Sequence, residues 1–211
     1  MIRGVDNYKI QAAQAKQLFL TYDQQELIQR CHLRQDADYF YIRFFASPYR
    51  ICRHTGDMQR WREEAWVDAN SFQEVMTILD WLCDSKPDRC PTGRWINVVS
   101  HCHSFHSNLQ EDAEDPVAAL FETHAQAFAD ACRALGGEKV PWADMAFAFE
   151  MVDGLGIMLQ LWYGDEEFPA RLRCLWDENV LQYIRYETTW YAVPLLIGRI
   201  KEEMRKMGCT L

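Results

Sequence analysis

Residues 98–108, VVSHCHSFHSN, place three histidines and one cysteine close together, and these side chains are common zinc ligands. A zinc site takes three or four protein ligands at distances of about 2.0 to 2.3 Å. If the segment forms a β-strand, successive side chains point to opposite faces, so that only His101 and His103 converge. We therefore expect at most a two-ligand metal site here, and the alternative is a polar strand edge that binds no metal.

Residues 161–172, LWYGDEEFPARL, combine three consecutive acidic residues with aromatic neighbours. Carboxylates bind hard cations through oxygen, and aromatic faces attract organic cations. Clustered carboxylates also raise one another's pKa, which would let one of Asp165, Glu166 or Glu167 act as a general acid or base. The simplest alternative is a solvated acidic turn whose neighbours, Trp162 and Phe168, belong to the hydrophobic core.

The elements that must position this acidic segment are three strands, MAFAFEM (145–151), IMLQLWY (157–163) and ARLRCLW (170–176). Turn sequences separate these apolar or alternating segments, which is typical of a three-stranded antiparallel meander. In a meander the start of the first strand lies beside the end of the second, so we expect Trp142 and Asp144 near Trp162. The resulting candidate ligand site comprises Trp142, Asp144, Trp162, Asp165, Glu166, Glu167 and Phe168.

Helix signals occur at both ends and in the middle of the chain. Helix-forming residues fill 6–22, and capping-box spacings at 23–26 and 71–74 indicate that two further helices begin there. An Asp-Pro pair, an apolar stripe and a Gly-Gly stop predict one continuous helix over residues 116–135. Residues 186–207 carry apolar side chains on one face and predict a C-terminal amphipathic helix.

Strand signals also occur in the first half of the chain. The alternation in residues 39–45 predicts a strand whose hairpin partner is 49–55, with the turn at Ser47 and Pro48, and residues 94–103 predict another strand. The predicted fold class is therefore α+β, with helices packed on the faces of an antiparallel or mixed sheet that includes the C-terminal meander. A length of 211 residues that are 49% hydrophobic favours a single domain spanning residues 1–211.

The composition excludes several classes of partner and location. A formal charge of −9 argues against binding to nucleic acid or to an anionic membrane surface. No segment approaches about 18 uninterrupted apolar residues, and the N-terminus lacks the apolar stretch of a secretory signal, so we expect a soluble, cytoplasmic protein. Its eight cysteines include no CxxC pair and are expected to be reduced thiols. No phosphate-binding loop or dinucleotide motif specifies a cofactor.

Three segments, GRWINV, LGGEKVPWADMAFAFEM and LQLWYGDEEFPARLRCLWDENVLQYIRYE, resemble a bacterial and archaeal family of domains of unknown function, numbered 3786. Its members share a tryptophan, an acidic turn ending in Phe-Pro, a Leu-Phe-Asp-like stretch and a downstream glutamate. The chain departs from this pattern at Trp176, where phenylalanine is usual, and at the turn VDGLGI, where a proline is usual. The resemblance highlights Trp162, Asp165, Glu166, Glu167, Phe168, Asp177 and Glu187.

The resemblance also implies a setting for the chain. The family carries no assigned activity, and some members are fused behind an iron-sulfur domain of the kind found in corrinoid proteins, which implies an anaerobic, cofactor- or metal-related role. This chain lacks the clustered cysteines of that attached domain, so no cluster is implied for it. The histidines of residues 98–108 are not a feature of the family.

Taken together, these patterns predict an accessory domain that binds a small molecule, a metal ion or a protein partner at the acidic and aromatic segment, without catalysis. The first alternative is an enzyme in which a carboxylate of the 165–167 turn acts as a general acid or base. The second is a structural module that associates, for example as a homodimer, through a sheet edge or the C-terminal helix.

Overall fold

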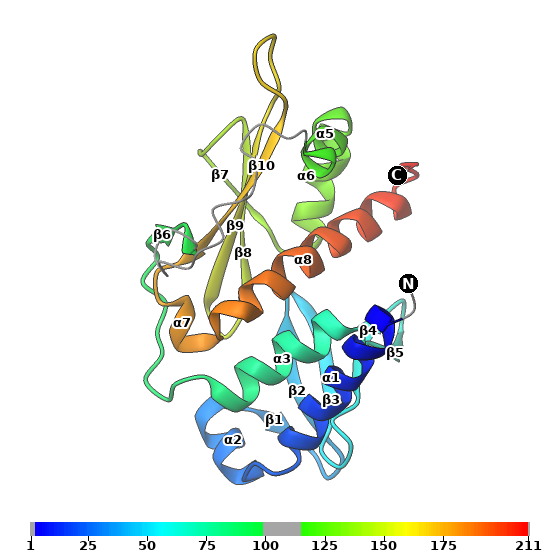
Figure 1. Ribbon diagram of the computed structural model, residues 1–211, viewed down its shortest axis with the longest axis vertical. Coiled ribbons are helices and arrows are strands. Elements are labelled where there is room, and N and C mark those ends of the chain that lie inside the picture. Colours follow the sequence, from blue (N-terminus) through cyan, green and yellow to red (C-terminus); the bar gives the residue numbers. More distant parts are fainter. Residues whose placement is uncertain (1–2, 99–114, 211) are drawn as a thin grey trace. The chain divides into compact units, whose positions relative to one another are not determined.

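A computed structural model describes residues 3–98 and 115–210 (Figure 1). The contacts of the chain divide it into two compact units, of which unit 1 comprises Met1–Cys90 and Leu181–Leu195, and unit 2 comprises Pro91–Val180 and Leu196–Leu211. Each unit combines helices with an antiparallel five-stranded sheet, which confirms the predicted α+β class for the described residues. A single domain over residues 1–211 stays a prediction.

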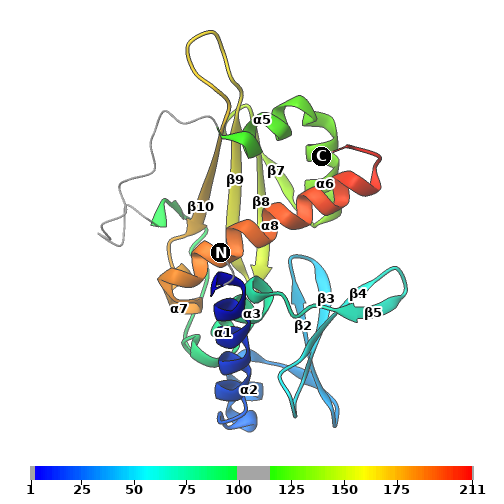
Figure 2. The same cartoon turned by 45° about the vertical axis from the view of Figure 1, so that its right-hand side comes forward.

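The helices of unit 1 cover one face of its sheet, as Figures 1 and 2 both show for α1 and α3. The ring of Phe19 on α1 contacts the ring of Phe40 with centroids 6.3 Å apart, and Tyr49 donates a hydrogen bond of 2.9 Å to Glu74 on α3. The strand order is β1-β2-β3-β4-β5. The elements are α1 (Arg3–Phe19), α2 (Gln24–Cys31), β1 (Arg34–Gln35), β2 (Tyr39–Phe44), β3 (Ser47–Cys52), β4 (Met58–Arg62), β5 (Ala65–Asp68) and α3 (Phe72–Asp84).

The predicted hairpin is β2–β3, but its turn was predicted two residues too late. Phe45 and Ala46 form the turn with φ of 44° and 57°, and Pro48 lies inside β3 opposite Arg43. Two successive residues in the left-handed region match the right-handed twist of the flanking strands, which a turn at Ser47 and Pro48 would not do, because proline cannot adopt a positive φ. The chain continues into a second hairpin, β4–β5, which sequence patterns did not predict.

Unit 2 contains the predicted meander, β8–β9–β10, in a sheet of order β6-β10-β9-β8-β7. Phe147, Leu159 and Cys174 lie side by side on one face of this sheet, and the ring of Phe128 on α6 packs edge-on against Phe147. Helices α7 (Val180–Tyr183) and α8 (Tyr186–Lys206) contain residues of both units. The other elements are β6 (Trp95–Ile96), α5 (Pro116–Thr123), α6 (Ala125–Ala134), β7 (Glu138–Val140), β8 (Met145–Val152), β9 (Leu155–Trp162) and β10 (Arg171–Asp177).

The single helix predicted over residues 116–135 is wrong, because the chain forms two helices that meet at His124 (φ −115°, ψ 40°). The rings of Phe121 and Phe128 stack with centroids 4.5 Å apart. In one straight helix two residues seven positions apart would be separated by about 10 Å along the axis. The break therefore lets both rings pack together in the core. The predicted cap at Asp115 is confirmed, since its carboxylate accepts hydrogen bonds from the N–H groups of Val117 and Ala118.

The segment before the histidines forms only a short strand in the described part of the chain. Of the strand predicted over residues 94–103, β6 comprises Trp95–Ile96 and pairs with β10. Asp177, at the end of β10, is buried and accepts hydrogen bonds from the N–H groups of Thr92, Gly93 and Asn179. Asp177 thus precedes α7 and also holds the loop that precedes β6.

Candidate functional site

The acidic segment between β9 and β10 is a loop with a fixed backbone, and it projects beyond α5 and α6 in both ribbon views (Figures 1 and 2). Asp165 Oδ1 accepts hydrogen bonds of 2.8 Å from the N–H groups of Glu167 and Phe168, and the Asp165 N–H donates to the carbonyl of Phe168. A side chain at Gly164 would place its Cβ 2.9 Å from the Ala170 nitrogen, so only glycine allows this close return of the chain.

Two carboxylates from α5 and its cap join this loop, although they are distant in sequence. Glu122 Oε1 accepts a hydrogen bond of 2.9 Å from the N–H of Gly164, and Asp115 Oδ2 accepts one of 3.3 Å from the N–H of Leu172. Asp115 and Glu122 line a hollow of about 440 Å³ together with loop residues. Among the loop residues that line it are Gly164, Asp165, Glu166, Glu167, Phe168, Pro169 and Ala170. We call Asp115, Glu122 and residues 162–168 the acidic tip.

Aromatic side chains at the acidic tip are exposed rather than buried. Trp162, Tyr163 and Phe168 line a second hollow of about 360 Å³, beside Arg171 and Arg173. Both hollows share Phe168 and Pro169, so one continuous surface joins the rings to the carboxylates. The exposed fractions are 43% for Trp162, 39% for Tyr163, 58% for Phe168 and 47% for the nearby Trp142. The alternative in which Trp162 and Phe168 belong to the core is therefore wrong.

The meander places most of the predicted site residues at one end of the sheet of unit 2. Asp165, Glu166, Glu167 and Phe168 line the acidic hollow. Asp144 lies beside them, because its Oδ2 accepts a hydrogen bond of 2.9 Å from the N–H of Tyr163. Neither Asp144 nor Trp142 lines either hollow. Sequence reasoning missed Asp115 and Glu122 as site residues, and its only signal for Asp115 was the helix cap.

The electrostatics of the loop do not resemble those of a general acid. Asp144, Asp165, Glu166 and Glu167 are all exposed. Hydrogen bonds from the N–H groups of Glu167 and Phe168 lower the pKa of Asp165, because they stabilise the ionised carboxylate. A general acid at neutral pH needs the opposite shift.

The predicted metal ligands His101 and His103 lie outside the described residues. Within residues 3–98 and 115–210, no group of three or more His, Cys, Asp or Glu side chains is arranged to hold a metal ion. The seven cysteines in this part of the chain form no disulfide bond with one another. None of the described helices is both long and apolar enough to cross a membrane.

A second polar cluster lies in unit 1, between α3 and the start of α8. The buried Asp80 accepts hydrogen bonds from the N–H and Nε of Arg185, of 2.7 and 2.6 Å, and from the hydroxyl of Thr188. Arg185 also forms an ion pair with Asp84. The cluster borders a hollow of about 180 Å³ whose lining includes Glu187, one of the positions that the family resemblance highlights. Its acids and its base pair with one another, as in a structural ion-pair network.

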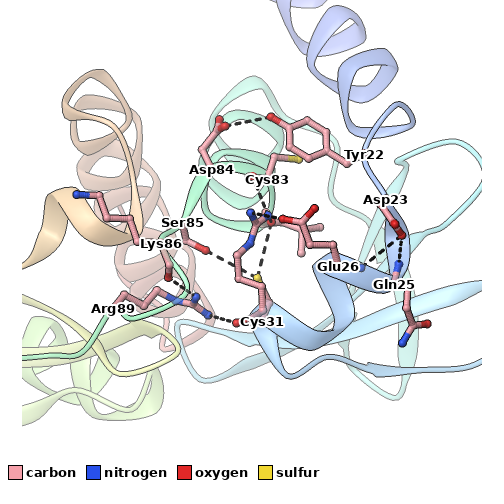
Figure 3. A network of polar contacts seen from close by, with 12 residues as sticks. Tyr22, Asp23, Gln25, Glu26, Cys31, Cys83, Asp84, Ser85, Lys86 and Arg89 are labelled. Atoms are coloured by element: carbon pink, nitrogen blue, oxygen red, sulfur yellow. Dashed lines mark hydrogen bonds and ion pairs between the residues drawn. The ribbon is translucent and has the colours of Figure 1, made fainter.

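From Asp84 the polar contacts continue to Tyr22, in the turn between α1 and α2, and a neighbouring set of contacts joins α2 to α3 (Figure 3). The hydroxyl of Tyr22 donates to Asp84, and burial together with this hydrogen bond raises the pKa of Tyr22 to about 12. Arg30 donates to the carbonyl groups of Leu82 and Cys83 at 2.9 and 2.7 Å. A cation at these carbonyls complements the negative end of the α3 dipole, so the network ties α2 to the end of α3.

Comparison with known proteins adds a family but no function. A family model described as "Domain of unknown function (DUF3786)" matches residues 23–199. Neither a curated protein nor a solved structure matches the chain. The match contains the whole loop between β9 and β10, together with Asp115 and Glu122.

Proposed function

The chain belongs to the DUF3786 family of domains of unknown function, so we propose its function from the geometry of the acidic tip. We propose that the tip binds a segment of a protein partner that carries basic side chains and can pack against aromatic rings, and that the protein catalyses no reaction. The observation that carries this proposal is the continuous surface on which exposed rings adjoin a hollow lined by five carboxylates. These are Asp115, Glu122, Asp165, Glu166 and Glu167.

The exposed rings support a protein partner. Tryptophan, tyrosine and phenylalanine are enriched in protein–protein interfaces, and such aromatic residues contribute much of the binding energy of these interfaces. A loop held by its own backbone hydrogen bonds presents Phe168 at little entropic cost on binding. Since two hollows meet at Phe168 and Pro169, an extended segment fits this surface better than a compact small molecule does.

The carboxylates support a cationic partner. Asp165 and Glu122 each use one oxygen to accept backbone N–H groups, which fixes their positions and leaves the other oxygen for a ligand. Glu166 and Glu167 are exposed beside them. Arginine suits such a place, because its planar guanidinium binds carboxylates and also stacks on aromatic rings.

We also propose a reducing compartment such as the cytoplasm for this protein, because the described cysteines form no disulfide bond.

Calorimetric titration with a short peptide of alternating arginine and tyrosine tests the proposal. Wild-type protein should bind the peptide, and added salt should weaken the binding, since the charges are exposed. Removing both charges with E166Q and E167Q should lower the affinity at least about tenfold, and Phe168→Ala should lower it similarly.

The matched control is Glu138→Gln, which removes an exposed carboxylate from β7, outside the acidic tip. This variant should bind like wild type. A peptide with glutamate in place of arginine should not bind. Absence of binding by wild type, or equal affinity in the E166Q/E167Q variant, would contradict the proposal.

A further inference from the structure

The sheet of unit 1 has a second face, opposite its core, which carries aromatic rings and arginines. Strand register places Tyr41 of β2 opposite Arg50 of β3, and Arg50 opposite Gln59 of β4. Trp61 of β4 is opposite Trp66 of β5. Because side chains alternate along strands, these residues and Tyr39 share the face away from the buried Phe40 and Ile51.

The rings on this face form one connected cluster. Centroid distances are 6.4 Å for Tyr39 and Tyr41, 6.3 Å for Tyr41 and Trp66, and 5.3 Å for Trp66 and Trp61. The β4–β5 hairpin leaves the direction of β2 and β3 in Figure 2, and this curvature lets Trp66 of the edge strand reach Tyr41. We call Tyr39, Tyr41, Arg50, Trp61 and Trp66 the aromatic face. Trp61 is its most exposed ring, at 42%.

Arg50 is held in place within the cluster, and its terminal Nη groups remain available as hydrogen-bond donors. Its guanidinium lies 4.3 Å from the ring centroid of Tyr39 and 4.6 Å from that of Trp66, and its Nε donates to Gln59 Oε1 at 2.7 Å. Its two Nη groups donate to no acceptor in the described part of the chain. A guanidinium fixed in this way is preorganised to bind a carboxylate through its terminal N–H groups.

The charges around the aromatic face add to this preference. Arg34 is paired with Tyr41 across β1 and β2, Arg43 lies two residues beyond Tyr41 on the same side, and both arginines are exposed. The carboxylate of Asp36 is already engaged, since it accepts the Tyr41 hydroxyl and the N–H groups of Asp38 and Tyr39. Asp68 lies opposite Gln59 on the same face and accepts a hydrogen bond from the side-chain amide of Asn70. Arg34, Arg43 and Arg50 still outnumber Asp36 and Asp68 here, so the face favours an anion although the chain has a net charge of −9.

We propose that the aromatic face binds the acidic tip of a second copy of this chain. The tip has what the face lacks, namely exposed carboxylates at Glu166 and Glu167 beside the exposed ring of Phe168. A carboxylate of the tip pairs with the Arg50 fork and with Arg43, and Phe168 packs against the exposed Trp61. This proposal rests on the proposed function, because it names the basic and aromatic partner of the same acidic tip.

A contact between two unlike surfaces has a consequence for assembly. Every copy carries one acidic tip and one aromatic face, so each copy can engage two neighbours or the same neighbour twice. The association is therefore concentration-dependent, and salt weakens it because its charges lie at the surface.

Sedimentation velocity over a range of protein concentrations and salt tests the contact. Wild-type protein should form reversible dimers or larger assemblies at low salt. Arg43→Glu and Glu167→Arg should each lower the association constant at least about tenfold, since each places like charges in contact. Arg43 is the better target than Arg50, because it is exposed and does not lie between rings.

Mixing the two variants gives the sharpest result. The R43E protein keeps an intact acidic tip, and the E167R protein keeps an intact aromatic face, so equal amounts of the two should associate again. A contact between two identical faces would not be restored in this way. Lys9→Glu, a charge reversal at an exposed position of α1, serves as the control and should assemble like wild type.

Wild-type protein that stays monomeric at every concentration, or variants that do not associate on mixing, would overturn the proposal. The arginine–tyrosine peptide then separates the two ideas. If the peptide still binds the R43E protein and requires Glu166 and Glu167, the acidic tip binds basic segments but not this chain. If the peptide does not bind, the proposed function fails as well.

Discussion

The ionisation of Tyr22 should make the free energy of unfolding depend on pH in alkaline solution. The hydroxyl of Tyr22 donates to Asp84, and its pKa is raised to about 12 from an ordinary value of 10. Burial and the hydrogen bond to Asp84 together raise the folded pKa above the unfolded one. The stability contributed by protonated Tyr22 is therefore complete below about pH 10 and is lost as pH rises through about 12.

The expected result is a difference between wild type and Tyr22→Phe in alkaline solution. Between about pH 10 and 12, the free energy of unfolding should fall more steeply with pH for wild type than for the variant. Urea denaturation at several pH values measures this slope. Equal slopes would show that the hydrogen bond to Asp84 does not hold the Tyr22 proton.

Asp80 is a buried residue of unit 1 whose loss should remove several polar contacts at once. Asp80→Asn keeps the shape of the side chain but removes the charge that pairs with Arg185 and turns one oxygen into a donor facing other donors. We expect a loss of about 1 to 3 kcal/mol in the free energy of unfolding, which chemical denaturation measures. Asp88→Asn, at an exposed position in the same unit, should leave stability unchanged.

At the scale of the element, replacing either of two glycines of unit 2 with alanine should change the stability in opposite directions. A Cβ at Gly137, between α6 and β7, would lie 2.6 Å from the ring of Phe149 and 2.8 Å from the carbonyl of Cys132, whereas a Cβ at Gly198 in α8 meets nothing within 4 Å. Gly137→Ala should destabilise the protein by about 1 to 3 kcal/mol through overpacking. Gly198→Ala should stabilise it by about 0.5 to 1 kcal/mol, because alanine restricts the unfolded chain and favours the helix.

Thermal unfolding of the two variants beside wild type checks this pair. The melting temperature should fall for Gly137→Ala and rise for Gly198→Ala. A rise for both would mean that Phe149 moves aside at little cost and that the close approach of β7 to α6 is not required.

Elements with strong local signals were also those that sequence patterns predicted well. The meander β8–β9–β10 alternates or is apolar throughout, and its first turn is an Asp-Gly pair that adopts positive φ at Asp153 and Gly154. The turn of β2–β3 was predicted at the wrong residues and the break at His124 was not predicted, because neither has a local sequence signal at its true position. Strand twist decided the turn, and the packing of Phe121 on Phe128 decided the break.

At the scale of the whole molecule, the charged side chains behind the net charge of −9 are unevenly distributed. The acidic tip of unit 2 gathers carboxylates beside exposed rings, while the aromatic face of unit 1 fixes one arginine and adjoins two more. The net charge argues against polyanionic partners, but as a sum over the whole chain it does not reveal a local cluster of arginines on one face of a sheet.

The sequence by itself determined the class of the fold, the meander and the loop residues of the acidic tip, because these depend on the spacing of neighbouring residues. Only the tertiary structure added Glu122, which lies 42 residues from Gly164 in the chain, and Asp115, which lies 57 residues from Leu172. Only the tertiary structure also assembled the aromatic face, because its rings come from different strands of a curved sheet. Long-range packing sets which side chains meet, and no local pattern encodes it.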